Sequence, residues 1–273
     1  MITPKVSVCI PTWCGGDFLE MAIRSVLAQT WQDFELIVID DASPDDTGTR
    51  VARYLGDRRV RYLRNPSNLR AEGNWNRCLE EARGEYVKVL PHDDLIEPDC
   101  LARQVAALDA HPDVVLSFAS RHIIGKGDKP LFVKRAPWKS GRVAADEVLR
   151  ACVRAGTNLI GEPGAVLFRR SAAERAGVFN ASIPYVLDLD YWCRLLAHGD
   201  AWCDDAPLAS FRVSTGSWSV AIGREQASEF SRFIQAIAHL PQVRAGDMDI
   251  AVGRLRARLN NLARRIIYTF VLR

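Results

Sequence analysis

Two adjacent carboxylates follow an apolar run in the stretch GEYVKVLPHDDLIEP, residues 84–98. Residues 86–90 predict a buried strand, and Asp93 and Asp94 come shortly after it. Ligands of open α/β sheets gather at the carboxyl ends of strands, and carboxylates crowded there repel each other unless a cation compensates them. Mg²⁺ and Mn²⁺ prefer oxygen ligands and often bridge a phosphorylated substrate to one or two carboxylates. The stretch is therefore either a metal site or a polar turn that caps the next helix.

A second acid pair, Asp40 and Asp41, follows the apolar run at 34–39. Strand ends of a parallel sheet can lie on one rim, so the two pairs are candidates for one site. A receiver domain also carries acid pairs at strand ends, and VIDDAS at 38–43 is compatible with one. Such a domain has only about half this length, however, and would leave the second half of the chain unexplained.

The elements that must position these acids alternate along the first 120 residues. Short apolar runs predict strands, and helical spacing of apolar residues between them predicts helices. This alternation is typical of an α/β fold with a mostly parallel sheet flanked by helices. We expect strands at 6–10, 34–39, 60–63, 86–90 and 114–118, and helices at 18–28, 44–54, 71–82 and 98–110.

The second half of the chain is less regular. Residues 121–138 are expected to form a mobile connection or an edge hairpin. Further strands are expected at 165–168 and 208–213, and helices at 146–154, 188–197, 225–239 and 249–270.

The composition is that of a soluble globular protein. Of the 273 residues, 48% are hydrophobic and 25% are charged, and no apolar stretch approaches the roughly 20 residues of a membrane span. The first residues run into a strand pattern without a secretory leader, which favours a cytoplasmic location. The seven cysteines lack CxxC spacing, which argues against a disulfide framework or a structural zinc site.

The C-terminal residues 250–273 are basic. They contain six arginines and no acid, and removing these six charges from the total of +3 leaves −3 for the preceding 249 residues. This asymmetry argues against a nucleic-acid partner spread over the whole surface. Apolar residues in this segment share one helical face: Leu255, Leu259, Leu262, Ile266 and Phe270. Such a basic amphipathic helix binds an anionic membrane surface, packs on the catalytic domain, or associates with a second copy.

Four segments together resemble the family 2 glycosyltransferases, in the order and spacing of that family and over roughly residues 5–215. They are VSVCIPTW at 6–13, FELIVIDDASPDDT at 34–47, NLRAEGNWNRCLEEARGEYVKVLPHDDLIEPD at 68–99 and PYVLDLDYWCRLLAHG at 184–199. The resemblance implies a GT-A (Rossmann-like) fold, a nucleotide-diphosphate sugar donor, usually a divalent metal (Mn²⁺ or Mg²⁺), and inversion at the anomeric carbon.

The resemblance also implies a donor site. Pro11 and Thr12 would line the nucleoside pocket, and Asp40 or Asp41 would hold the base or ribose. Two residues of the next segment, Arg70 and Asn74, could face the donor, with Arg70 on a phosphate.

The metal motif departs from the family pattern. Asp93 matches the last Asp of the DxD motif and would bind the metal, but Pro91 replaces the first Asp. Asp94 would be the second metal ligand, and His92 a donor-side residue that could assist. Metal affinity would then be weaker than is usual in the family.

Asp188 matches the Asp of the family's ED motif and is the expected general base, which takes the proton of the acceptor hydroxyl. The Glu of that motif is Leu187 here, and Asp190 is the second candidate. The competing interpretation treats both acids as ordinary charges at a helix N-terminus. The turn GEPG at 161–164 resembles the acceptor-side turn of the family. Lys88 lies in a strand expected to be buried on both faces, so it either reaches a carboxylate or marks an open face.

The resemblance implies a glycosyltransferase of hexosyltransferase type. It would move a sugar from a UDP-, dTDP- or GDP-sugar to a hydroxyl of a glycan or lipid-linked acceptor, as in the polysaccharide biosynthesis of a cell envelope. The alternative is a non-catalytic sugar-nucleotide-binding regulator or scaffold, suggested by Pro91 and Leu187. We expect a GT-A domain at 1–219, with a nucleotide-binding half at 1–120 and an acceptor-side half at 121–219. A basic C-terminal helical extension at 220–273 would allow peripheral attachment to the inner face of the cell membrane.

Overall fold

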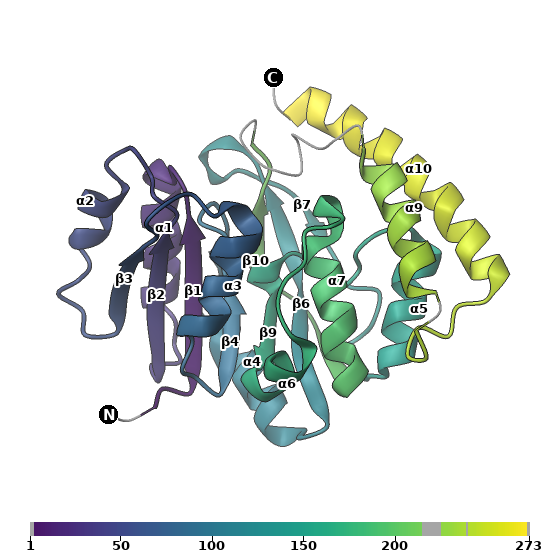
Figure 1. Cartoon of the computed structure of the whole chain (residues 1–273), viewed down its shortest axis with the longest axis horizontal. Coiled ribbons are helices and arrows are strands. Elements are labelled where there is room, and N and C mark those ends of the chain that lie inside the picture. Colours follow the sequence, from purple (N-terminus) through teal and green to yellow (C-terminus); the bar gives the residue numbers. More distant parts are fainter. Residues whose placement is uncertain (1–2, 215–224, 239, 272–273) are drawn as a thin grey trace.

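The first part of the chain forms the parallel half of a single large sheet. The computed structural model describes residues 3–214, 225–238 and 240–271 (Figure 1). Four strands pair in parallel in the order β3-β2-β1-β4: β1 (Val6–Thr12), β2 (Phe34–Asp40), β3 (Val60–Arg64) and β4 (Tyr86–Val89). The helices between them are α1 (Gly16–Leu27), α2 (Thr47–Ala52) and α3 (Arg70–Glu81). Every residue of β1 and β2 is buried, as expected for strands covered on both faces.

The second part of the chain continues the same sheet with mixed pairing. Its elements are β5 (Leu95–Ile96), α4 (Cys100–Ala110), β6 (Val114–Ile124), β7 (Pro130–Lys134), β8 (Gly141–Val143), α5 (Ala145–Ala155), β9 (Val166–Arg169), α6 (Arg170–Ala176), α7 (Leu187–Leu195) and β10 (Asp200–Arg212). Strand β9 lies antiparallel between β4 and β6, and β10 runs parallel to β6. The expected parallel pairing therefore describes β1 to β4, and the segment 121–138 includes the edge hairpin that was one of its two expected forms, with β7 paired to β6.

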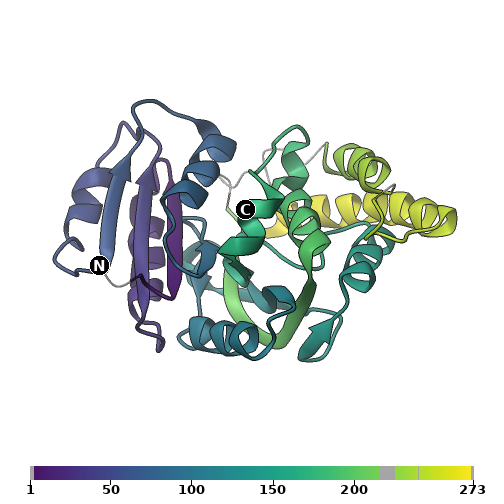
Figure 2. The same ribbon diagram turned by 60° about the horizontal axis from the view of Figure 1, so that its bottom comes forward.

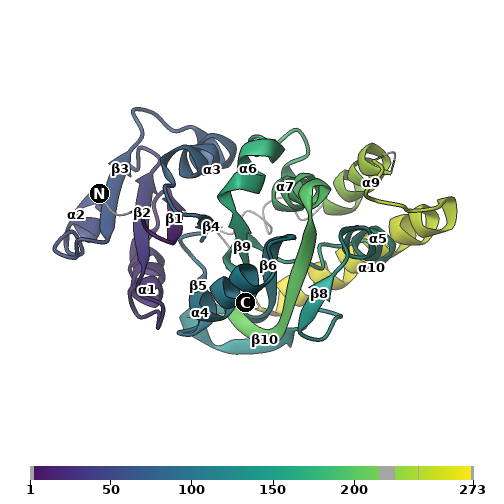
Figure 3. The same cartoon turned by 90° about the horizontal axis from the view of Figure 1, so that it is seen from below.

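Two hydrophobic cores cover the two faces of the sheet. Alternate residues of β1 point to opposite sides: Cys9 joins the core under α3, whereas Val8 joins the core under α1 and α4. Figure 3 shows α3, α6 and α7 on one face of the sheet and α1 and α4 on the other. This layering leaves the strand ends free to carry polar side chains.

The chain ends in two helices, α9 (Gln226–Ile237) and α10 (Asp247–Val271). They lie at the end of the molecule opposite β3, next to α5 (Figures 1 and 2). The expected boundary between the main domain and this extension, 219/220, lies outside the described residues. Within the described ranges, no helix is both long and apolar enough to cross a membrane.

Small residues bring α10 onto α5. A Cβ added at Gly253 would lie 2.1 Å from the carbonyl oxygen of Val153, and one at Gly156 would lie 2.5 Å from the backbone nitrogen of Ala257. Asn260 donates to the carbonyl oxygen of Ala155 at 2.9 Å. The packed face of α10 is therefore the face without the leucines.

The leucine stripe of α10 points away from the protein. Leu255, Leu259, Leu262 and Ile266 are 51–58% exposed, and the side chain of Phe270 lies outside the described part. Of the three alternatives for the stripe, packing on the catalytic domain is wrong, because the Gly and Ala face allows a closer backbone approach than a row of leucines would.

Candidate active site

The ends of β1 and β2 bring the expected nucleoside residues together. Thr12 and Asp40 are partners in the parallel register, and Asp41 N donates to the carbonyl oxygen of Thr12 at 2.8 Å. All of these residues, and Pro11 beside Thr12, are buried. The Thr12 hydroxyl has no hydrogen-bond partner among the described residues, so it is available to a ligand.

The two acids at the end of β2 differ in how many of their carboxylate oxygens accept hydrogen bonds from the protein. Asp40 Oδ2 accepts from Tyr62 at 2.7 Å and from Arg64 at 2.5 Å, and Oδ1 accepts from Ser43 N at 2.9 Å. Asp40 therefore holds the strand ends in place.

Asp41 Oδ1 accepts from Asn65 Nδ2 at 2.6 Å and from Leu69 N at 2.8 Å. Its second oxygen, Oδ2, has no such partner in the described part of the chain. Asp41 is thus the better placed of the two acids to accept a bond from a base or ribose.

Strained backbone surrounds this rim. Cys14, Ala42 and Arg70 have φ values of 52°, 58° and 61°, a region that non-glycine residues rarely occupy. They follow β1, follow β2 and begin α3. Backbone strain of this kind gathers at ligand-binding sites.

The two expected donor-side residues of α3 have different positions. The Arg70 side chain is exposed at the start of the helix and is available to a phosphate. Asn74 is 4% exposed and donates to the carbonyl oxygen of Ile39 at 3.2 Å, while it accepts from Asn65 at 3.1 Å. In this structure Asn74 connects α3 to β2.

The acid pair after β4 lies against the end of β10. Arg212 N donates to Asp94 Oδ1 at 3.0 Å, and Arg212 Nε donates to the carbonyl oxygen of Asp93 at 2.8 Å. Burial, and next the charge of Asp93, raise the pKa of Asp94 well above its usual value. His92 lies near Thr12, because a Cβ added at Gly15 would be 2.6 Å from Thr12 Oγ1 and 3.3 Å from His92 Cδ2.

The acid pair suits a divalent cation that is shared with a diphosphate. The carboxylate of Asp93 is partly exposed and has no hydrogen bond or ion pair to any described residue. A cation would offset the repulsion that raises the pKa of Asp94. Groups of three or more His, Cys, Asp or Glu side chains arranged for a metal are absent from the described ranges. Two carboxylates are nevertheless the usual protein contribution when substrate phosphates complete the coordination.

Asp188 lies at the start of α7, where it is partly buried. Oδ2 accepts from Asn158 Nδ2 at 3.0 Å, and Oδ1 accepts from Leu189 N at 2.7 Å. Burial, and next the negative charge of Glu162, raise the pKa of Asp188 to about 7. A carboxylate with this pKa takes a proton readily near neutral pH.

Asp190 points to a different neighbour. Two residues along a helix correspond to a rotation of roughly 200°, so Asp190 and Asp188 cannot share one face. Asp190 Oδ2 accepts from Arg194 Nε at 3.0 Å and from Arg194 Nη2 at 2.8 Å, and Arg194 also donates to the carbonyl oxygen of Ala176 at 2.6 Å. This arrangement ties α7 to α6.

Glu162, which we did not single out from the sequence, joins the two acidic regions. It forms an ion pair with the buried Arg121, and the positive charges of Arg121 and Lys134 lower its pKa against the effect of burial. Its own negative charge raises the pKa values of both Asp94 and Asp188. The GEPG turn was the available signal, but its pairing with Arg121 spans 41 positions of the chain.

Lys88 holds the turn that carries Glu162. Its side chain is fully buried, and Nζ donates to the carbonyl oxygens of Gly164 at 2.9 Å and Val166 at 3.0 Å. Both expectations for Lys88 are wrong, since it neither reaches a carboxylate nor marks an open face. Carbonyl acceptors satisfy it because β9 pairs antiparallel beside β4.

The chain matches the sequence model of a known family. The model described as "Glycosyl transferase family 2" covers residues 7–177, which include the strand ends and acid pairs described above. The chain belongs to glycosyl transferase family 2. It is 35% identical over 202 residues to the "Uncharacterized protein MT1568" of Mycobacterium tuberculosis, covering 71% of this chain and 62% of that one.

A second family 2 relative is the "Uncharacterized glycosyltransferase RT0329" of Rickettsia typhi. It is 29% identical, and the match covers 77% of this chain and 64% of that one. This family 2 chain thus spans less than two thirds of the length of both relatives.

Solved structures confirm the expected GT-A fold with a C-terminal helix. S. aureus TarS 1–349 in complex with UDP-GlcNAc superposes with a TM-score of 0.69 at 17% identity, over 94% of this family 2 chain and 72% of TarS 1–349. The mannosyltransferase PcManGT of Pyrobaculum calidifontis, in complex with GDP-Man and Mn²⁺, gives a TM-score of 0.65 at 19% identity, over 95% and 70% of the two chains.

Proposed function

We propose that the chain is an inverting glycosyltransferase that moves a sugar from a nucleotide-diphosphate sugar to a hydroxyl of a glycan or lipid-linked acceptor. The observation that carries the proposal is Asp188, a partly buried carboxyl group whose pKa of about 7 suits proton abstraction. The donor complexes of the two similar structures, with UDP-GlcNAc and with GDP-Man, support a nucleotide sugar as donor.

The proposed reaction is a single displacement. Asp188 takes the proton of the acceptor hydroxyl while that oxygen forms a bond to the anomeric carbon. The bond between this carbon and the diphosphate oxygen breaks, and the electron pair leaves with the nucleotide diphosphate. Attack from the face opposite the leaving group inverts the anomeric carbon.

The donor side would be held by residues at the strand ends. Asp41 accepts from the base or ribose, Thr12 offers its hydroxyl, and Arg70 reaches a phosphate. Asp93 and Asp94 would hold Mn²⁺ or Mg²⁺. When bound, such an ion neutralises charge on the leaving diphosphate.

Glu162 would position the base. It keeps the pKa of Asp188 high enough for the carboxyl group to act near neutral pH, and Arg121 keeps Glu162 ionised. Asn158 fixes the orientation, because its amide also donates to the carbonyl oxygen of Gly161 at 3.0 Å and its Oδ1 accepts from Gly161 N at 2.9 Å.

The test is a donor screen followed by turnover. UDP-, GDP- and dTDP-sugars are compared by thermal shift with and without Mn²⁺, and the stabilising donors are then assayed for transfer or hydrolysis. Turnover that EDTA abolishes, with inverted product by NMR, is the expected result. Stabilisation by a donor without any turnover would favour the regulator, for which Pro91 and the buried Leu187 in place of acids are the supporting residues.

A further inference from the structure

The outer face of α10 carries an exposed apolar stripe bordered by arginines. Leu255, Leu259, Leu262 and Ile266 follow each other at intervals of four, three and four residues, and each is more than half exposed. On a helix with 100° between residues, these side chains lie within an arc of roughly 60°. Contiguous exposed apolar residues of this kind mark an interaction surface.

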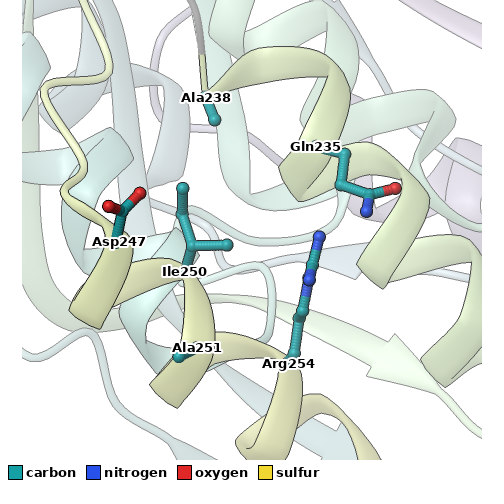
Figure 4. A pocket seen from close by; sticks show the side chains of 6 residues that line it. All are labelled: Gln235, Ala238, Asp247, Ile250, Ala251 and Arg254. Carbon is teal, nitrogen blue, oxygen red and sulfur yellow. The ribbon is translucent and has the colours of Figure 1, made fainter.

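The basic residues of α10 divide between its two faces. Arg264 belongs to the inner face, where Nε donates to Gln226 Oε1 at 2.7 Å and the guanidinium lies over the ring of Tyr185. Arg254 also turns inward, toward Gln235 on α9 (Figure 4). Arg258 and Arg265 are exposed and border the leucine stripe. Arg256 is exposed as well, but its Nη1 donates to the carbonyl oxygen of Arg154 on α5 at 3.4 Å.

A pocket lies beside the stripe, between α9 and α10. Its lining includes Asp247, Ala251 and Arg254, with Gln235, Ala238 and Ile250 completing it (Figure 4). Asp247 and Arg254 bring opposite charges to this pocket, so it does not select a ligand of one sign. The stripe and its arginines, by contrast, present one sign only, because residues 250–271 contain no acid.

We propose that the outer face of α10 binds an anionic lipid bilayer. Leucine and isoleucine would enter the boundary between headgroups and acyl chains, while the bordering arginines meet anionic headgroups. A second copy is disfavoured as occupant, since a self-complementary contact through this stripe would bring two sets of arginines together without acids from the same face. The proposal does not rest on the transferase activity.

The inner face of α10 contacts the region of the proposed base, so a test of the outer face must leave the inner face unchanged. Arg264 lies over Tyr185, and Tyr185 N donates to Glu229 Oε2 of α9 at 2.7 Å. Tyr185 is three residues before Asp188, so deleting α10 would disturb the base as well as any membrane contact. Substitutions confined to the outer face separate the two effects.

The experiment is flotation of the full chain with lipid vesicles. One set is phosphatidylcholine alone, and the other contains about one third phosphatidylglycerol. The stripe variant is L255S/L259S/L262S/I266S, the charge variant is R258Q, and the matched control is L55S/V178S, which removes two exposed apolar residues elsewhere. Melting temperatures of all four proteins report whether the fold is retained.

We expect the wild type and the control to float with anionic vesicles only. The stripe variant should bind at least roughly tenfold more weakly, and loss of Arg258 should cost about fivefold in affinity. Added salt should also weaken binding. Equal flotation of the stripe variant, or no flotation of the wild type, would overturn the proposal. A dimer that the stripe substitutions dissociate, together with no vesicle binding, would instead assign the face to a second copy.

Discussion

Asn158 donates a hydrogen bond from Nδ2 to Oδ2 of Asp188 at 3.0 Å, and the same amide holds the backbone of Gly161. The residue after Gly161 is Glu162, whose charge raises the pKa of Asp188. One asparagine thus fixes both the orientation of the proposed base and the turn carrying the charge that tunes it. The proposed chemistry therefore depends on a group of side chains that come from distant parts of the chain.

Replacing Asp188 with Asn should remove the proposed base while keeping its shape. Transfer is expected to fall by about 100- to 10,000-fold, the usual contribution of a positioned base. Donor binding, measured by thermal shift, should persist. The matched variant D190N loses only the ion pair with Arg194 and should keep turnover within a few-fold. If D190N lost turnover while D188N kept it, the roles of the two acids would be exchanged.

The rate of transfer should depend on pH through Asp188. The base acts when ionised, so kcat/KM should fall below an apparent pKa of about 7. E162Q removes the negative charge that raises the pKa of Asp188. It also leaves the positive charge of Arg121 without its partner, and that charge lowers the pKa of Asp188. Both effects move the acid limb of the profile toward lower pH. An unchanged limb in E162Q would contradict the proposed coupling of Glu162 to Asp188.

The same pKa makes Asp188 a cost to stability at neutral pH. Its folded pKa of about 7 lies above the roughly 3.9 of an unfolded chain, so the folded state binds the proton more tightly. The stability that this group contributes is complete below about pH 4 and is lost as pH rises to about 7. D188N cannot ionise and should become more stable than the wild type by up to about 4 kcal/mol near pH 8, the product of roughly 3 pKa units and 1.36 kcal/mol per unit. Melting curves at about pH 4 and pH 8 measure the difference, which should be small at the lower pH.

Lys88 should matter for both stability and rate. K88M leaves the carbonyl oxygens of Gly164 and Val166 without their donor inside the protein. Such losses cost about 1–3 kcal/mol each, partly offset because the buried ammonium is removed, so we expect a destabilisation of about 2 kcal/mol. A Tm lower by several degrees with reduced kcat is the expected result. A variant as stable and as active as the wild type would show that the turn does not need this lysine.

Asp93 should govern the effect of metal on donor binding. D93N removes the partly exposed carboxylate, so the extra thermal shift that Mn²⁺ adds to the donor should shrink by several-fold or disappear. The shift with nucleotide alone should change little. D94N serves as a comparison, because its neutral amide also relieves the repulsion that raises the pKa of Asp94. Retention of the full Mn²⁺ effect in both variants would remove the acid pair as the metal site.

The first half of the fold could be predicted because its signals are local. The apolar runs before Asp40 and Asp93 become β2 and β4, since a buried parallel strand is a short apolar stretch. The strand expected at 114–118 extends instead to Ile124. Its later residues include Ser120 and Arg121, polar residues that the sequence alone would predict to be exposed. Arg121 is buried only because Glu162 compensates its charge, and that pairing is not local.

The candidate site shows the same division. Motif positions placed Thr12 at the end of β1, Asp41 directly after β2 and Asp93 in the turn after β4, where the structure has them. Motif positions did not indicate that Asn74 would bind its neighbours in the fold, or that Glu162 would act on Asp188. The sequence also did not indicate that the α10 stripe faces outward, because that orientation depends on the close contact between Gly253 and α5.

The contact of Gly253 and Ala257 with α5 has one more consequence. A helix held by its glycine and alanine face does not need the large apolar side chains of its outer face for folding. Substitutions on the outer face of α10 can therefore accumulate at little thermodynamic cost, and they do not touch the residues of the proposed active site. Relatives that share the main domain can then differ in membrane binding through a few substitutions on this one helix.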